Sequence, residues 1–225
     1  MIPLRDDNPI RSRPVVTIAV IVLCTLVFLW QLSLSPDAEQ QAAYLFGFIP
    51  ALLFGNATLE GQWIPAGATI VTGMFLHGGP LHLLGNMLYL WIFGDNIEDR
   101  LGHGRFVVFY LVCGAVAALG QGVIDPRSTV PMIGASGAIS GVLGAYLVLY
   151  PRAKVLVLSL VFLITTVRVP ALVVLGIWFV GQLLSSLMAS PGSGGGVAFA
   201  AHVGGFVAGV LLIRVFLRER RRPRR

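Results

Sequence analysis

The chain has 225 residues, of which 56% are hydrophobic and only 12% charged. A soluble domain carries about twice that share of charge, so the composition excludes an ordinary soluble enzyme and indicates a polytopic membrane protein. The net charge is +6, and seven of the sixteen basic residues lie between Arg214 and Arg225. They directly follow a hydrophobic run, which favours anchoring to membrane lipid over binding of nucleic acid.

The apolar runs predict six transmembrane helices, and with them an all-α fold. Four runs are long enough to cross a bilayer as helices: 15–34, 106–123, 169–187 and 197–216. Two more are shorter or interrupted by glycine, at 81–97 and 133–149. Seventeen helical residues still reach about 25 Å, which is enough for a thin bilayer.

Three further apolar stretches are not predicted to cross. Residues 44–55 and 63–75 are broken by glycine or proline, so we expect interfacial or re-entrant pieces and a membrane-embedded first outer loop. Residues 155–166 are rich in β-branched side chains and too short to span as a helix. They are interpreted as a membrane-dipping hairpin or a surface segment.

The basic residues alternate between the connections. They precede the first span and then lie in every second loop, whereas residues 31–80 contain no Lys or Arg. This pattern predicts both termini in the cytoplasm, in the inner membrane if the cell is bacterial. The expected organisation is a cytoplasmic segment 1–13, a six-helix membrane domain 14–217 and a basic cytoplasmic tail 218–225.

Polar side chains occur at one depth in three of the predicted helices. The second, fourth and sixth spans all run from outside to inside, and their first turns contain His82, Asn86, Ser136 and His202. Polar groups inside membranes are costly and usually functional. Gly137-xxx-Gly141 and Gly205-xxx-Gly209 form small-residue faces that allow the fourth and sixth spans to approach closely. We therefore expect Ser136 to meet His202.

A serine beside a histidine is the minimal nucleophile and base arrangement. No carboxylate lies at that depth, so a Ser136–His202 dyad fits better than a triad. His82 and Asn86 are one helical turn apart and hence on one face, from which they can donate hydrogen bonds to an oxyanion. The Ser136 backbone N–H, at the positive end of its helix, is expected to help.

Four motifs resemble the rhomboid family of intramembrane serine proteases: "HGGPLHLLGN", "GDNIEDRLG", "GASGAISG" and "AHVGGFVAG". The resemblance covers residues 73–210. It implies that Ser136 is the nucleophile and His202 the base, with His82 and Asn86 stabilising the oxyanion. It also implies that Gly134 matches the glycine two residues before the serine, and that Glu98 and Gly102 belong to a structural turn.

The sequence departs from the family pattern in two places. Many members have an aromatic residue four positions after the nucleophile, stacked on the histidine, where this chain has Ser140. Many also carry a Trp-Arg pair in the first outer loop, where this chain has Trp63 without the arginine. The first difference concerns the support of His202 and the second the shape of the loop.

The predicted function is intramembrane cleavage of transmembrane proteins near the outer membrane boundary, without a metal or cofactor. Trp178, Phe179 and Gln182 are candidates for a lateral gate, and the connector 190–196 for a lid.

Competing interpretations were weighed against this one. His77, His82 and His202 would make a poor zinc site, because no carboxylate or cysteine accompanies them. His77 is instead interpreted as a loop-end residue, and His103 as solvated. The sequence is also compatible with an inactive family member that binds membrane clients and, less well, with a small transporter.

Overall fold

The structure is a computed structural model that describes residues 2–159, 165–188 and 199–217. The chain is mostly helical. Within the described ranges, three helices are long and apolar enough to cross a membrane: α1 (Val15–Leu32), α6 (His103–Ile124) and α9 (Phe199–Phe216). The remaining predicted spans correspond to the shorter apolar helix α7 (Ser136–Leu149), to α8 (Ala171–Met188), whose apolar part is Ala171–Ser185, and to the longer and more polar α5 (Pro80–Leu101).

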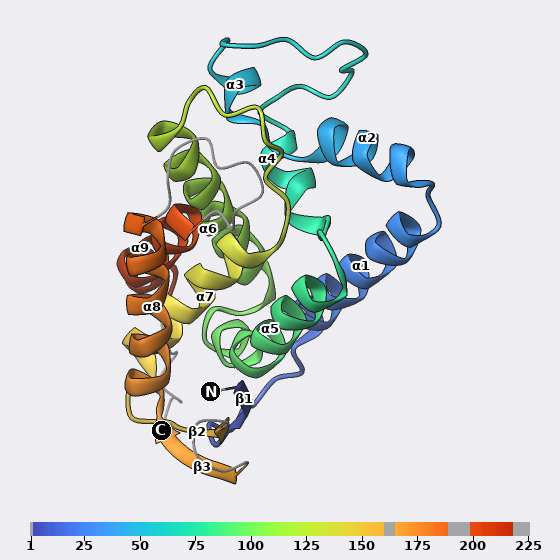
Figure 1. Cartoon of the computed structure of the whole chain (residues 1–225). Helices are drawn as coiled ribbons and strands as arrows, with labels where there is room; N and C mark the ends of the chain where they lie inside the picture. The colour runs from blue at the N-terminus through green and yellow to red at the C-terminus, as the bar shows by residue number, and fades with distance from the viewer. Residues whose placement is uncertain (1, 160–164, 189–198, 218–225) are drawn as a thin grey trace.

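Short helices form the connection between α1 and α5. They are α2 (Pro36–Phe46), α3 (Pro50–Leu53), α4 (Thr69–Thr72) and the 3₁₀ helix η1 (Gly73–Phe75). Ser35 caps α2, because its Oγ accepts a hydrogen bond from Ala38 N at 3.4 Å, and Pro36 follows at the first turn. Figure 1 places α2 and α3 at one end of the molecule, opposite the strands.

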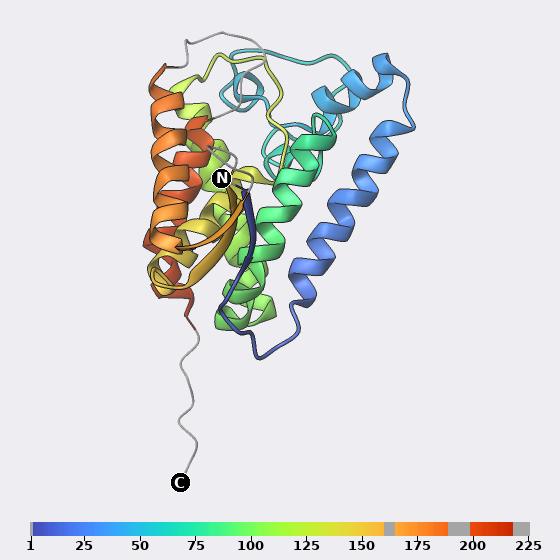
Figure 2. The ribbon, with the colours of Figure 1, turned by 60° about the horizontal axis from the view of Figure 1, so that its bottom comes forward.

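The prediction of an all-α chain is wrong in one respect, because a three-stranded antiparallel sheet closes the other end. Its strands are β1 (Ile2–Asp6), β2 (Lys154–Ser159) and β3 (Thr165–Pro170), in the order β1-β2-β3. Strand β2 lies almost entirely within residues 155–166, the stretch interpreted as a hairpin or surface segment, whereas β3 begins at its end and runs into the start of the predicted span 169–187. Residues 160–164 lie outside the described residues. Figure 2, in which this end of the molecule comes forward, shows the strands in front of the helices.

The strand β1 is attached to the helices through a polar network. The Asp6 carboxylate accepts hydrogen bonds from the Tyr146 hydroxyl and, at 3.2 Å, from Asn96 Nδ2. Burial raises the pKa of Asp6, which the hydrogen bond from Tyr146 partly offsets. These contacts tie β1 to α5 and α7. A five-residue strand is therefore held mainly by tertiary contacts, which explains why the local sequence did not predict it.

Glu98 connects the end of α5 to the start of α1. Its fully buried carboxylate accepts hydrogen bonds from Val16 N at 2.8 Å and Thr17 N at 2.7 Å. The first N–H groups of a helix have no intrahelical partner and carry partial positive charge, so a carboxylate there both caps and stabilises α1. His103 Nδ1 lies 2.6 Å from the same carboxylate. The imidazole, expected to be solvated, is half exposed but has this partner.

Helices α7 and α9 touch backbone to backbone. A Cβ atom built on Gly205 would overlap the Gly137 carbonyl oxygen, and one built on Gly209 would overlap the Gly141 carbonyl oxygen. The two small-residue faces therefore pack against each other, as the sequence predicted. Figure 1 shows α9 at the left side of the bundle, next to α8 and α7.

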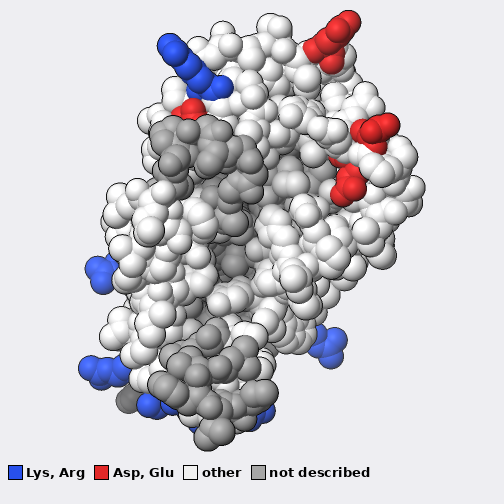
Figure 3. All heavy atoms as spheres, viewed as in Figure 1, with Lys and Arg blue, Asp and Glu red and all other residues white. Residues whose placement is uncertain are grey.

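Charged side chains divide between the two ends of the molecule. In the view of Figure 3, Lys and Arg gather mainly at the end that holds the sheet, whereas Asp and Glu lie mainly at the end that holds α2 and its following loop. The band between the two ends is almost free of charge in this view. Such a band is typical of a surface that faces lipid.

Substitution of Gly205 by alanine is expected to lower stability by about 1–3 kcal/mol, because the added methyl group overpacks the α7–α9 contact. The neighbouring Gly204 provides a matched control. A Cβ there would lie 3.8 Å from its nearest neighbours, which is an ordinary contact. Thermal unfolding in detergent should show a lower Tm for Gly205→Ala and an unchanged or raised Tm for Gly204→Ala. Equal midpoints for the two variants would contradict the packing argument.

Candidate active site

Ser136 is the first residue of α7, and the loop before it is fixed by backbone hydrogen bonds. Met132 and Phe48 exchange two such bonds, with Met132 N to Phe48 O at 2.8 Å. Gly134 N donates to Gly73 O at 2.8 Å. These bonds join the serine loop to the connection between α1 and α5. They place the Ser136 hydroxyl and the first N–H groups of α7 at a defined position.

Ser136 and His202 are in hydrogen-bonding contact. His202 Nε2 lies 2.7 Å from Ser136 Oγ, although 66 residues separate them in the sequence. The imidazole is 8% exposed and belongs to the first turns of α9. On its other side, His202 Nδ1 lies 2.6 Å from Oε1 of Gln182 in α8. The partner of Nδ1 is thus a neutral amide and not a carboxylate.

His82 and Asn86 converge on Gly134. A Cβ atom built on Gly134 would lie 2.7 Å from His82 Nε2 and 3.6 Å from Asn86 Nδ2. Both nitrogens are therefore directed at the loop that ends two residues later in Ser136. The φ angle of Gly134 is +121°, a backbone conformation that residues with a side chain rarely adopt. Glycine is required here twice, for the backbone angle and for the approach of the His82 ring.

His82 Nε2 and Asn86 Nδ2 can each donate a hydrogen bond to a bound group. Gly78 N donates to His82 Nδ1 at 3.3 Å, so Nδ1 is the acceptor and the ring proton belongs on Nε2. Asn86 Nδ2 is buried and has no partner among the described residues. A buried amide without a partner is costly, so this group is suited to a ligand oxygen.

His77 lies behind His82. From the sequence, His77 was interpreted as a loop-end residue. In the structure its side chain is fully buried, and the centroid of its ring lies 5.2 Å from that of His82. Gln31 holds its backbone by accepting from His77 N at 3.0 Å and donating to His77 O at 3.1 Å. Burial, together with the neighbouring His82, lowers the pKa of His77 to about 4, so the ring is neutral near pH 7.

Ser140 does not contact the imidazole in the way the family's aromatic residue would. Its hydroxyl donates to Ser136 O at 2.6 Å, one turn back along α7. Two other rings lie beside His202. Trp178 of α8 is at a centroid distance of 6.1 Å and an interplanar angle of 35°, and Phe199 of α9 is at 6.5 Å and 86°. The sequence identified Trp178 and Gln182 only as gate candidates, because spacing along α8 does not reveal which face meets α9.

Trp63 and the connector 190–196 are the remaining outer-loop features named from the sequence. Trp63, which lacks the neighbouring arginine of many relatives, is 72% exposed and contacts the edge of Phe46 at a centroid distance of 6.1 Å. The connector 190–196, a candidate lid, lies outside the described residues. The described part of the chain contains no group of three or more His, Cys, Asp or Glu side chains that could hold a metal ion.

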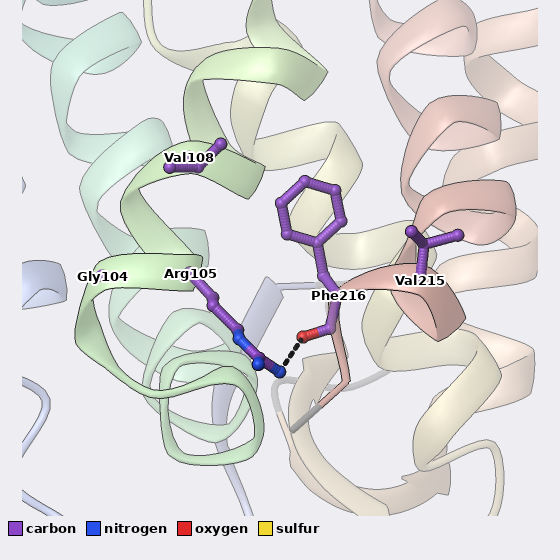
Figure 4. Close-up of a pocket in the computed structure, with 5 residues that line it drawn as sticks. All are labelled: Gly104, Arg105, Val108, Val215 and Phe216. Atoms are coloured by element: carbon purple, nitrogen blue, oxygen red, sulfur yellow. Dashed lines mark hydrogen bonds between the residues drawn. The ribbon is translucent and has the colours of Figure 1, made fainter. Parts of the chain in front are cut away.

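One surface hollow among the described residues lies away from Ser136 and His202. A volume of about 600 Å³ is lined by Gly104, Arg105, Val108, Val215 and Phe216, at the end of the bundle that holds the sheet. Figure 4 shows Arg105 reaching from α6 to the end of α9, where its Nη1 donates to Phe216 O at 3.5 Å. It also donates to Leu217 O at 2.9 Å. This guanidinium caps α9 and takes no part in the arrangement around Ser136.

Several known proteins are similar in sequence to this chain. Rhomboid protein 1, mitochondrial, of Saccharomyces cerevisiae is 34% identical over 68% of this chain and 43% of its own length. Rhomboid protease GluP of Bacillus subtilis is 40% identical over 39% of this chain and 16% of its own length. For Rhomboid protease GlpG of Salmonella choleraesuis the identity is 30%, over 60% of this chain and 43% of that protein.

This chain therefore spans less than half the length of these relatives. The Rhomboid domain matches residues 64–219, which include His82, Asn86, Ser136 and His202. That match covers more than half of the chain. The protein belongs to the rhomboid family.

Proposed function

We propose that this protein is an intramembrane serine endopeptidase that cleaves transmembrane proteins near the outer membrane boundary. The observation that carries the proposal is the 2.7 Å distance between Ser136 Oγ and His202 Nε2 in a buried setting. The names of two relatives, Rhomboid protease GluP and Rhomboid protease GlpG, add support. No metal or cofactor is needed for this chemistry.

The mechanism follows from the two ring nitrogens of His202. With its proton on Nδ1, the imidazole accepts the Ser136 hydroxyl proton at Nε2 while Oγ attacks the scissile carbonyl. The imidazolium then gives this proton to the leaving amine. An acyl-enzyme remains on Ser136, and a water molecule, deprotonated by the same nitrogen, hydrolyses it.

Negative charge develops on the carbonyl oxygen during both steps. His82 Nε2, Asn86 Nδ2 and the Ser136 N–H are the donors proposed to stabilise it. Each such donor contributes about 2.7–4 kcal/mol in comparable sites. The substrate must present an unwound segment, because a helical carbonyl is already hydrogen-bonded. Glycine or proline in the substrate helix would ease this unwinding.

The proposed membrane topology has six spans with both termini on the cytoplasmic side. The spans are α1, α5, α6, α7, α8 and α9, and the connection from α2 to η1 is embedded at the outer surface. The division of charge between the two ends of the molecule supports this orientation, since Lys and Arg favour the cytoplasmic side. The site around Ser136 then lies below the outer surface, where water can enter. In a bacterial cell the membrane would be the inner one.

Removal of the nucleophile is expected to abolish cleavage. Purified Ser136→Ala, incubated with a transmembrane substrate in detergent or vesicles, should lose activity by a factor of about 10³ or more. Ser140→Ala is the matched control and should keep most of its activity, because Ser140 donates only to a backbone carbonyl. Cleavage that persists in Ser136→Ala would refute the proposed mechanism. A wild-type protein that binds the substrate without cleaving it would indicate a client-binding member instead.

Loss of an oxyanion donor is expected to affect kcat more than KM. Asn86→Ala should lower kcat by about 10²–10³, because the amide acts on charge present only in the transition state. Asn56→Ala is the control, since that amide donates to Pro126 O in an exposed loop. A change confined to KM would mean that Asn86 binds the ground state and is not an oxyanion donor.

The topology can be tested by cysteine labelling. Both native cysteines are fully buried, so a Cys24→Ala, Cys113→Ala background is suitable for single exposed probes. With a membrane-impermeant maleimide on intact cells, Glu60→Cys should react, whereas Ile10→Cys, Arg152→Cys and a cysteine added after Arg225 should react only after permeabilisation. Labelling of the added C-terminal cysteine in intact cells would contradict an even number of spans.

A further inference from the structure

The orientation of His202 depends on what its second ring nitrogen contacts. A general base must hold its lone pair towards the nucleophile, and the hydrogen bond at the other nitrogen decides which tautomer is present. In this chain that hydrogen bond joins His202 Nδ1 to Gln182 Oε1 at 2.6 Å. An amide oxygen accepts but cannot donate, so Nδ1 must carry the proton. Nε2 is then the acceptor that faces Ser136 Oγ.

We propose that Gln182 is a positioning residue, which fixes the tautomer and the ring orientation of His202 from helix α8. Gln182 acts through the imidazole and does not touch the reacting atoms. This inference rests on the proposed protease function and deepens it. It adds a third member to the Ser136–His202 pair and assigns that member to a helix that contributes neither of the other two.

Trp178 lies beside the imidazole on the same face of α8 as Gln182. Trp178 and Gln182 are four residues apart, so they lie one above the other on one side of the helix. The Trp178 ring is tilted by 35° against that of His202 at 6.1 Å. The residues Val180 and Leu184, at 51% and 53% exposure, lie on other faces of α8. The face that carries Trp178 and Gln182 therefore meets α9.

Helix α7 offers no comparable support on its own side of the ring. The residue that is aromatic in many relatives is Ser140, and its hydroxyl donates to Ser136 O at 2.6 Å. The hydroxyl is thus directed along α7. The imidazole is supported from α8, through the Gln182 hydrogen bond and the Trp178 ring.

The cost of a glutamine in an apolar helix also points to a specific role. Gln182 interrupts the run "ALVVLGIWFVGQLL", residues 171–184. A polar side chain within such a helix is expensive unless it has a partner. The contact with His202 satisfies the amide oxygen, and the same contact requires α8 to be packed against α9.

The test compares three purified variants with the wild type. Gln182→Met keeps a similar volume but removes the acceptor, Gln182→Glu keeps an acceptor oxygen, and Leu184→Met changes an exposed position of the same helix. For each, kcat and KM are measured separately with a transmembrane substrate. The rate at which a fluorophosphonate labels Ser136 and the Tm are measured in parallel.

Gln182→Met is expected to lower kcat and the labelling rate roughly 10- to 100-fold, because a misoriented base no longer accepts the serine proton. KM and Tm should change little. Gln182→Glu should recover most of the lost rate, and Leu184→Met should match the wild type. Recovery by glutamate would also identify the acceptor oxygen as the group that matters, since a carboxylate has no N–H.

Two results would overturn the inference. One is an unchanged kcat and labelling rate in Gln182→Met. The other is a loss of rate in Gln182→Met that follows a fall in Tm and is shared by Leu184→Met, which would show a structural role only. Failure of the proposed function is distinguishable, because cleavage would then survive in Ser136→Ala or be missing from the wild type, whatever residue stands at position 182.

Discussion

The close contact between α7 and α9 is the constraint on which the candidate site depends. Lipid chains are as apolar as the helices, so association in a membrane relies on packing and on hydrogen bonds. At Gly205 and Gly209 no side chain separates the two backbones. A serine hydroxyl and an imidazole can then meet at 2.7 Å without distortion of either helix. With larger residues at these glycines, the same two side chains would be held apart.

A second set of contacts fixes the depth of the site. Gly134 N donates to Gly73 O, and the Phe48–Met132 pair joins the outer connection to the loop before α7. Glu98 and the Asp6 network hold the opposite end of the bundle, where α1, α5, α7 and β1 meet. The helices are thus tied at both ends, and the polar groups of the site lie at one of them. Pre-organised donors of this kind act on developing charge without reorganisation.

Much of this arrangement could be predicted from the sequence, because helices that cross a membrane need long apolar runs and rarely contain polar residues. Hydropathy located the helices, and the shared depth of His82, Asn86, Ser136 and His202 followed from their positions in the first turns. The role of Gly134 as a close approach was available only through the family motif. Strand β1 was missed because its pairing partner is about 150 residues away. The Gln182 contact was missed because the facing of α8 against α9 is set by packing, which no local pattern encodes.

The apolar half of the bundle below the site explains why hydrolysis fits this arrangement better than transport. Beneath Ser136, α7 buries Val142, Leu143 and Ala145, and α9 buries Phe206 and Ile213. An ion or polar solute on its way to the sheet end would have to leave its hydration shell at this layer, at a cost of several kcal/mol or more. In the proposed reaction a peptide carbonyl needs no such passage, since it would react at the depth of Ser136 and its products would leave by the outer side. One-sided access for water is therefore sufficient for cleavage and insufficient for transport.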